Sequence, residues 1–299
     1  MSMRQTTGIL LALTLGAALS VSGQPRLTAK IGETHKILRT DVFHGFDRTV
    51  FDFDGYEAWV VEPRGPAREG RPWTWTMQWA TAFVPRTGVP KLLADGYHHV
   101  TIITYKDRMD ETGLRVSAKF QKYLVDALGF APKADLIGMS WGGFFSTRYA
   151  AAYPQNVDKI YLDAPLLCFP DFDPATERTE AKRGPWAKMA PADGKWSRDP
   201  RMPVNLAEKL AATGIPIFFV YGGQDDSCPP AINAVPFLAK YRAAGGEKSL
   251  KVLYRSFFGH HPHGVELDDP AIVNFFEKPF VPDAKAQNIL GAQTPTGRR

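Results

Sequence analysis

Along most of the chain, segments with hydrophobic residues at helical spacing alternate with short apolar runs typical of strands. Apolar side chains three or four positions apart over residues 113–128 predict an amphipathic helix. Short β-branched and aromatic runs predict strands at 56–63, 72–76, 99–104, 134–138, 157–162, 215–221 and 250–254. Further helices are predicted at 141–153 and 231–243 and from residue 270.

Strands that alternate with helices predict an α/β fold: a mostly parallel central sheet flanked by helices. Sites in such sheets lie at the carboxyl ends of the strands. Closely spaced prolines interrupt the pattern between residues 165 and 203 and exclude a long regular element there. We therefore expect a lid-like insertion at about 165–205.

The N-terminal segment is typical of a secretory signal peptide. Arg4 precedes an apolar stretch over residues 9–19, which is too short to span a bilayer comfortably. We predict a signal peptide at 1–22 and a secreted or periplasmic protein; an N-terminal membrane anchor is the alternative. A single α/β domain is expected at 23–283, followed by a polar, flexible tail at 284–299.

Composition narrows the function classes. The 299 residues are 44% hydrophobic, which supports a large core and argues against intrinsic disorder. The net charge of +5 is spread along the chain, without the focused basic stripe expected of a nucleic-acid-binding protein. The two cysteines, Cys168 and Cys228, are compatible with either a disulfide or two buried thiols. The oligomeric state stays open.

Gly138-Met139-Ser140-Trp141-Gly142 matches the pattern G-x-S-x-G. The pentapeptide follows a predicted strand and opens a predicted helix, which is the setting of a nucleophile elbow. An ordinary glycine-rich turn is the alternative. The setting favours Ser140 as a nucleophile.

A serine nucleophile requires a general base, and three histidines follow the last predicted strand. His260 is the first choice, while His261 and His263 are alternatives. A metal site made of these three is disfavoured, because neighbours on a proline-containing loop rarely converge on one ion. We expect neither a metal ion nor a cofactor.

The base requires an acid, and the oxyanion requires two backbone N–H donors. Asp225, just past the strand at 215–221, is the preferred acid, with Asp226 and Asp163 as alternatives. The order Ser, Asp, His along the chain supports this set. Trp141 and Trp75 are the predicted oxyanion-hole residues.

Together these motifs resemble the α/β-hydrolase superfamily, and within it secreted bacterial serine esterases. The resemblance runs from about residue 56 to 276, with the elbow as its most specific part. It rests on Pro72-Trp73-Thr74-Trp75, the elbow, Asp163-Ala164-Pro165, the loop at 222–229 and the histidine loop at 259–264. Thr76 departs from the Arg that such relatives tend to carry.

The resemblance implies Ser140 as nucleophile, Asp225 as acid and His260 as base. Such relatives typically cleave carboxylic esters, often acyl groups on carbohydrates, so a small-molecule or carbohydrate ester is the expected substrate. A serine peptidase on the same fold is the alternative enzyme. A catalytically silent binding protein is the alternative outside the enzymes.

Overall fold

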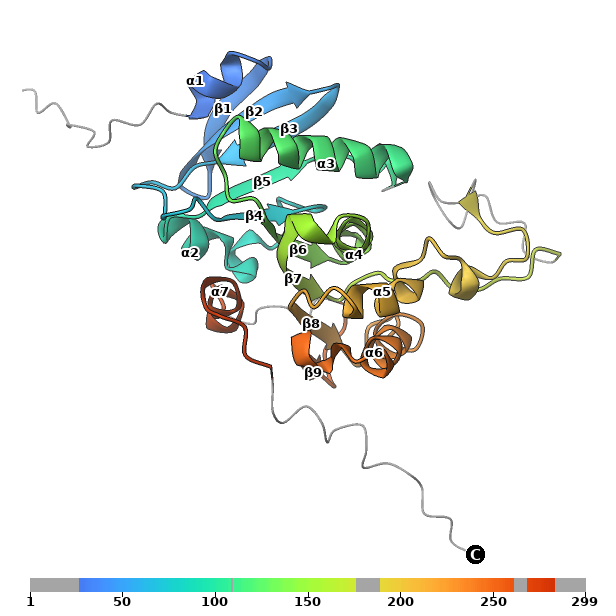
Figure 1. Ribbon diagram of the computed structural model, residues 1–299. Coiled ribbons are helices and arrows are strands. Elements are labelled where there is room, and N and C mark those ends of the chain that lie inside the picture. The colour runs from blue at the N-terminus through green and yellow to red at the C-terminus, as the bar shows by residue number, and fades with distance from the viewer. Residues whose placement is uncertain (1–26, 109, 176–188, 261–267, 283–299) are drawn as a thin grey trace, which may run out of the picture.

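A nine-stranded sheet forms the centre of the molecule (Figure 1). The computed structural model describes residues 27–108, 110–175, 189–260 and 268–282. The strand order is β1-β2-β3-β5-β4-β6-β7-β8-β9. The strands are β1 (Ile37–Phe43), β2 (Phe46–Phe53), β3 (Tyr56–Val61), β4 (Trp73–Thr76), β5 (His98–Ile102), β6 (Ala134–Met139), β7 (Val157–Asp163), β8 (Ile217–Gly222) and β9 (Leu250–Arg255).

Seven α-helices lie among the described residues. They are α1 (Leu27–Gly32), α2 (Val89–Ala94), α3 (Glu111–Asp126), α4 (Trp141–Ala152), α5 (Ala207–Ala211), α6 (Ala234–Ala243) and α7 (Pro270–Glu277). Short 3₁₀ helices are η1 (Val84–Thr87), η2 (Tyr105–Asp107), η3 (Pro154–Asn156), η5 (Trp196–Arg198), η6 (Pro203–Asn205) and η7 (Gly246–Ser249). None of the helices in the described ranges is long and apolar enough to cross a membrane.

The sheet is parallel from β5 through β4, β6, β7 and β8 to β9, which confirms the predicted mostly parallel sheet. The strands β1, β2 and β3 join it antiparallel at one edge. The sequence-based prediction missed β1 and β2. Most of β1 is exposed or half-exposed, so it lacks the continuous apolar run of a buried strand.

Two layers of helices cover the two faces of the sheet (Figure 1). On one face, apolar side chains of α3, α4, α5 and α6 pack with Leu136 of β6 and Phe219 of β8. On the other face, α2 and α7 pack with Ile137 and Phe218. Adjacent residues of one strand thus enter opposite cores, because successive side chains alternate in direction. This burial on both faces explains the unbroken apolar runs in the sequence.

The segment at 165–205 is built around buried aromatic and apolar side chains in its described parts, 165–175 and 189–205. Trp196 is fully buried, and its ring meets Phe169 edge-on at a centroid distance of 5.0 Å. Leu167 and Met202 are also fully buried. These parts of the insertion therefore belong to the core, whereas a lid function stays a prediction.

Several expectations concern parts of the chain outside the described residues. The signal peptide at 1–22 and the tail at 284–299 both lie there, so they stay predictions. The question of the two cysteines is answered: Cys168 and Cys228 are buried free thiols.

Asp135 is a buried carboxyl group inside β6. It is 5% exposed, and its Oδ1 has no hydrogen-bond partner within the described residues. Burial raises its pKa well above the usual value, and the negative charge of Asp158 adds to the rise. The folded protein therefore holds the proton at Asp135 more tightly than the unfolded chain does.

We expect Asp135→Asn to stabilise the protein at pH 8. A raised folded-state pKa means that unfolding becomes easier as pH rises from about 4 through the folded-state pKa. The neutral amide removes this penalty, so Tm should rise by about 2 °C or more at pH 8, and less near pH 4. Calorimetry at both pH values, with the exposed Asp126→Asn as control, tests this. A lower Tm at pH 8 would contradict it.

Candidate active site

Ser140 lies at a strained turn between β6 and α4. Its backbone has φ 50° and ψ −118°, a conformation that non-glycine residues rarely adopt. Hydrogen bonds on both sides hold it: its N–H donates to the Asp163 carbonyl at 3.0 Å, and its carbonyl accepts from Leu166 N–H at 2.9 Å. The strand-to-helix turn predicted from the pentapeptide is therefore present. It places Ser140 at the carboxyl end of β6.

The glycines around Ser140 allow close backbone packing. A Cβ atom on Gly138 would lie 2.9 Å from the Gly142 carbonyl oxygen and from Ser146 Oγ. A Cβ atom on Gly143 would lie only 2.3 Å from Pro165 Cβ. Because real Cβ atoms do not approach so closely, the helix can begin directly behind Ser140 only with glycine at these positions.

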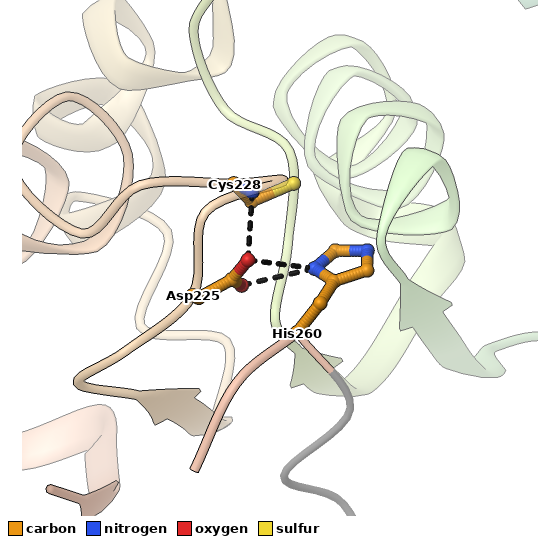
Figure 2. A group of neighbouring side chains, drawn as sticks. All are labelled: Asp225, Cys228 and His260. Atoms are coloured by element: carbon orange, nitrogen blue, oxygen red, sulfur yellow. Dashed lines mark hydrogen bonds and ion pairs between the residues drawn. The ribbon is translucent and has the colours of Figure 1, made fainter. Parts of the chain in front are cut away.

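His260 connects Ser140 to Asp225. Its Nε2 lies 2.9 Å from Ser140 Oγ, and its Nδ1 lies 3.0 and 2.9 Å from the two oxygens of Asp225. Figure 2 shows the Asp225 carboxylate facing the ring nitrogen. The side chain of Asp225 is 1% exposed and that of His260 is 16% exposed. The three residues chosen from the sequence thus form one hydrogen-bonded chain.

The turn after β8 fixes the Asp225 carboxylate. Its Oδ1 accepts hydrogen bonds from the backbone N–H groups of Ser227 at 3.0 Å and Cys228 at 2.8 Å. Burial alone raises the pKa of Asp225, but the hydrogen bonds from His260 and from these two N–H groups outweigh it. The net effect lowers the pKa below its usual value. Asp225 is therefore an ionised acceptor for His260 Nδ1–H at neutral pH.

Two further glycines bring the histidine loop close to Asp225. A Cβ atom on Gly222 would lie 2.2 Å from the Phe258 carbonyl oxygen, and one on Gly223 would lie 2.6 Å from that of Ser256. Backbone hydrogen bonds then join the loops, including Gln224 N–H to Phe258 O at 2.9 Å. The Gly222-Gly223 pair is a sequence signal for this close approach, and we missed it as such.

The alternative acids differ from Asp225 in their surroundings. Asp163 is fully buried, and its Oδ2 accepts a hydrogen bond from the Tyr161 hydroxyl at 2.5 Å. Asp226 is exposed and lines a cavity beside Ser140. His261 and His263 lie outside the described residues.

The oxyanion-hole prediction for Trp75 is wrong. Trp75 lies inside β4, paired with β5 at Val100 and with β6 at Leu136, so its backbone belongs to the sheet. Its indole is fully buried and packs against Tyr149. The loop after β4 is what reaches the elbow: Gln78 O lies 3.3 Å from a Cβ atom placed on Gly142.

Trp141, the other predicted oxyanion-hole residue, is the first residue of α4. The first N–H groups of a helix point out of its N-terminus, which favours negative charge there. Its position directly after Ser140 is compatible with the predicted role, which stays a prediction.

Two cavities flank Ser140 and His260. One, of about 300 Å³, is lined by Trp79, Ala82, Phe83 and Met139 in addition to these two residues. The other, of about 310 Å³, has mainly apolar walls from the insertion and the loop after β8, including Trp141, Leu166, Phe169, Pro170 and Ile232. Both cavities open on the Ser140 side chain, so a bound molecule has room on either side of it.

Comparison with known proteins agrees with this geometry. The family model described as "alpha/beta hydrolase fold" matches residues 39–195, more than half of the 299-residue chain. The chain belongs to the alpha/beta hydrolase family. None of the curated proteins compared with this alpha/beta hydrolase matches it.

Solved structures share the fold at low sequence identity. A protein described as a dipeptidyl aminopeptidase IV, from Bacteroides ovatus, is 14% identical with a TM-score of 0.56, over 82% of this chain. The alpha/beta hydrolase spans only 36% of the length of that protein. Est1E from Butyrivibrio proteoclasticus is 17% identical with a TM-score of 0.55, over 76% of this chain and 96% of its own.

We expect Gly143→Ala to destabilise the hydrolase. The new methyl group would overlap Pro165, and relief requires moving either α4 or the segment after β7. Overpacking of this kind costs about 1–3 kcal/mol. Chemical denaturation measures the change. Gly65→Ala is the control, because a Cβ atom there meets nothing within 4 Å. Equal stability of the two variants would contradict the packing argument.

Proposed function

We propose that this chain is an exported serine hydrolase that cleaves carboxylic esters, with Ser140 as nucleophile, His260 as base and Asp225 as acid. The observation that carries the proposal is the position of His260, 2.9 Å from Ser140 Oγ and 2.9 Å from the Asp225 carboxylate. Export rests on the signal peptide predicted at residues 1–22.

The proposed reaction has two steps. His260 Nε2 takes the proton of Ser140 as its Oγ attacks the ester carbonyl, and the alcohol leaves with that proton. A water molecule then gives a proton to His260 and attacks the acyl-enzyme. His260 returns that proton to Ser140 Oγ as the bond to the acyl group breaks and the carboxylic acid is released. Asp225 accepts Nδ1–H throughout, which stabilises the positive charge on His260 after it takes the proton.

We propose two backbone positions for the oxyanion donors. The first is the N–H of Trp141 at the start of α4. The second comes from residues 77–79, in place of Trp75, because this loop borders Gly142 and lines a cavity together with Ser140. Trp79 has φ 62°, and left-handed backbone at a non-glycine residue is concentrated at functional sites.

The cavities support an ester with apolar groups. Trp79 and Phe83 are large side chains left about half exposed beside Ser140. On the opposite side, Phe169 and Leu166 form part of an apolar wall. A site with apolar walls and few polar groups favours apolar substituents. Acyl groups carried on carbohydrates fit the proposal if the sugar stays toward solvent.

The alternative functions predict different observations. A serine peptidase uses the same three residues, so the triad does not separate amides from esters. A catalytically silent binding protein does not need the chain of contacts from Ser140 through His260 to Asp225. That chain favours an enzyme.

We expect Ser140→Ala to lower kcat/KM for an ester by about 10⁴-fold or more, because no other hydroxyl replaces the nucleophile. Intact-mass analysis after a fluorophosphonate probe should show one adduct in the wild type and none in the variant. Ser256→Ala, at an exposed serine, should keep both the adduct and the activity. Labelling or full activity of Ser140→Ala would refute the assignment.

The ester preference is tested with matched chromogenic substrates. We expect p-nitrophenyl esters of short apolar acids to be cleaved with a kcat/KM at least about 10²-fold above that of aminoacyl p-nitroanilides. Lengthening the acyl chain should lower the rate once the chain outgrows the cavity at Phe83. Faster cleavage of the anilides, abolished by Ser140→Ala, would favour the peptidase.

A further inference from the structure

The thiol of Cys228 lies against the proposed catalytic residues and has no part in the proposed mechanism. Cys228 is three residues after Asp225, on the turn whose N–H groups bind that carboxylate. One ligand atom each from Asp225, Cys228 and His260 lies within 4.8 Å of the others. Figure 2 shows the three side chains gathered at one point, from two different loops.

We propose that Asp225, Cys228 and His260 form an inhibitory site for a soft or borderline divalent metal ion such as Zn²⁺ or Cd²⁺. Thiolate, imidazole and carboxylate are the ligands that zinc uses in proteins, and three of them with water complete a tetrahedral site. The adjoining cavity of about 310 Å³ includes Cys228 and His260 in its lining and has room for that water.

Metal binding at His260 opposes its role as a base. In the proposed mechanism Nδ1 carries the proton, which it donates to Asp225, and Nε2 accepts from Ser140. A metal ion on Nδ1 moves the imidazole proton to Nε2, which then donates to Ser140 Oγ instead of accepting its proton. A metal ion on Nε2 occupies the same lone pair directly. Either arrangement stops the activation of Ser140.

Cys228 would bind the metal ion through its sulfur atom as a thiolate. A soft cation displaces the thiol proton as it binds: the S–H bond breaks, the metal–sulfur bond forms, and one proton goes to solvent.

This site differs from the three-histidine cluster weighed in the sequence. Its ligands come from the loop after β8 and the loop after β9, which the Gly222 contact holds together. The inhibitory part of the proposal rests on the proposed function of His260. The binding part does not, because a metal–thiolate bond is detected without any turnover.

Titration of the purified protein with Cd²⁺ tests binding. We expect the ultraviolet charge-transfer band of a cadmium–thiolate bond, with one ion per chain. Cys228→Ser should abolish the band. Cys168→Ser is the matched control, because Cys168 lines the same cavity but is not in the cluster, and it should keep the band. A band that survives in Cys228→Ser, or that is lost in Cys168→Ser, would overturn the site.

Inhibition by Zn²⁺ is measured separately, as the concentration that halves the initial rate of each variant relative to its own metal-free rate. Cys228→Ser should raise that concentration about 10-fold or more, and Cys168→Ser should leave it near the wild-type value. EDTA should restore activity, and Mg²⁺, a hard cation, should not inhibit. A Cys228-dependent band with no loss of turnover would overturn the inhibition while leaving the metal site in place.

Discussion

The site depends on one strained backbone position. Ser140 occupies a left-handed conformation that costs of order 1–3 kcal/mol, and it persists only where the surroundings hold it. Here the neighbouring strand β7 does so, through the Asp163 carbonyl, and the chain beyond it does so through Leu166 N–H. The strain is therefore offset by the same parallel sheet that buries the apolar runs of the sequence. A sheet with a different strand order would leave this turn without its hydrogen bonds.

The second requirement is that loops distant in sequence meet at one edge. The carboxyl ends of β6, β8 and β9 carry Ser140, Asp225 and His260 respectively, and parallel strands deliver these ends to the same side. The glycine at 222 removes the side chain that would separate Asp225 from the histidine loop, and backbone hydrogen bonds then fix its distance.

The elements with a regular hydrophobic pattern or a motif of known setting could be predicted from the sequence. The parallel strands, α3 and α4 are recognisable because both faces of the sheet are buried and because G-x-S-x-G has a fixed setting. The antiparallel strands β1 and β2 were missed because most of β1 is exposed or half-exposed and because polar residues interrupt the apolar positions of β2. The helices α1, α2 and α5 were missed because each has only five or six residues. The error at Trp75 does not come from the strand bounds, because the predicted strand at 72–76 and β4 both end at Thr76. Trp75 lies inside that strand, where the backbone pairs with β5 and β6. The loop residue Gln78, two positions past the end of β4, takes its place beside the elbow.

The turn at 225–228 carries both the carboxylate that orients His260 and the thiol of the proposed metal site. Its N–H groups keep Asp225 ionised, which orients His260 and supports positive charge on the ring. The same turn places the buried Cys228 thiol near this carboxylate. Burial raises the pKa of the thiol to about 12, and the negative charge of Asp225 adds to the rise. In the proposed metal site, a divalent cation is attracted by the same carboxylate and replaces the thiol proton. The proposed sensitivity to soft metals thus uses the carboxylate that orients His260.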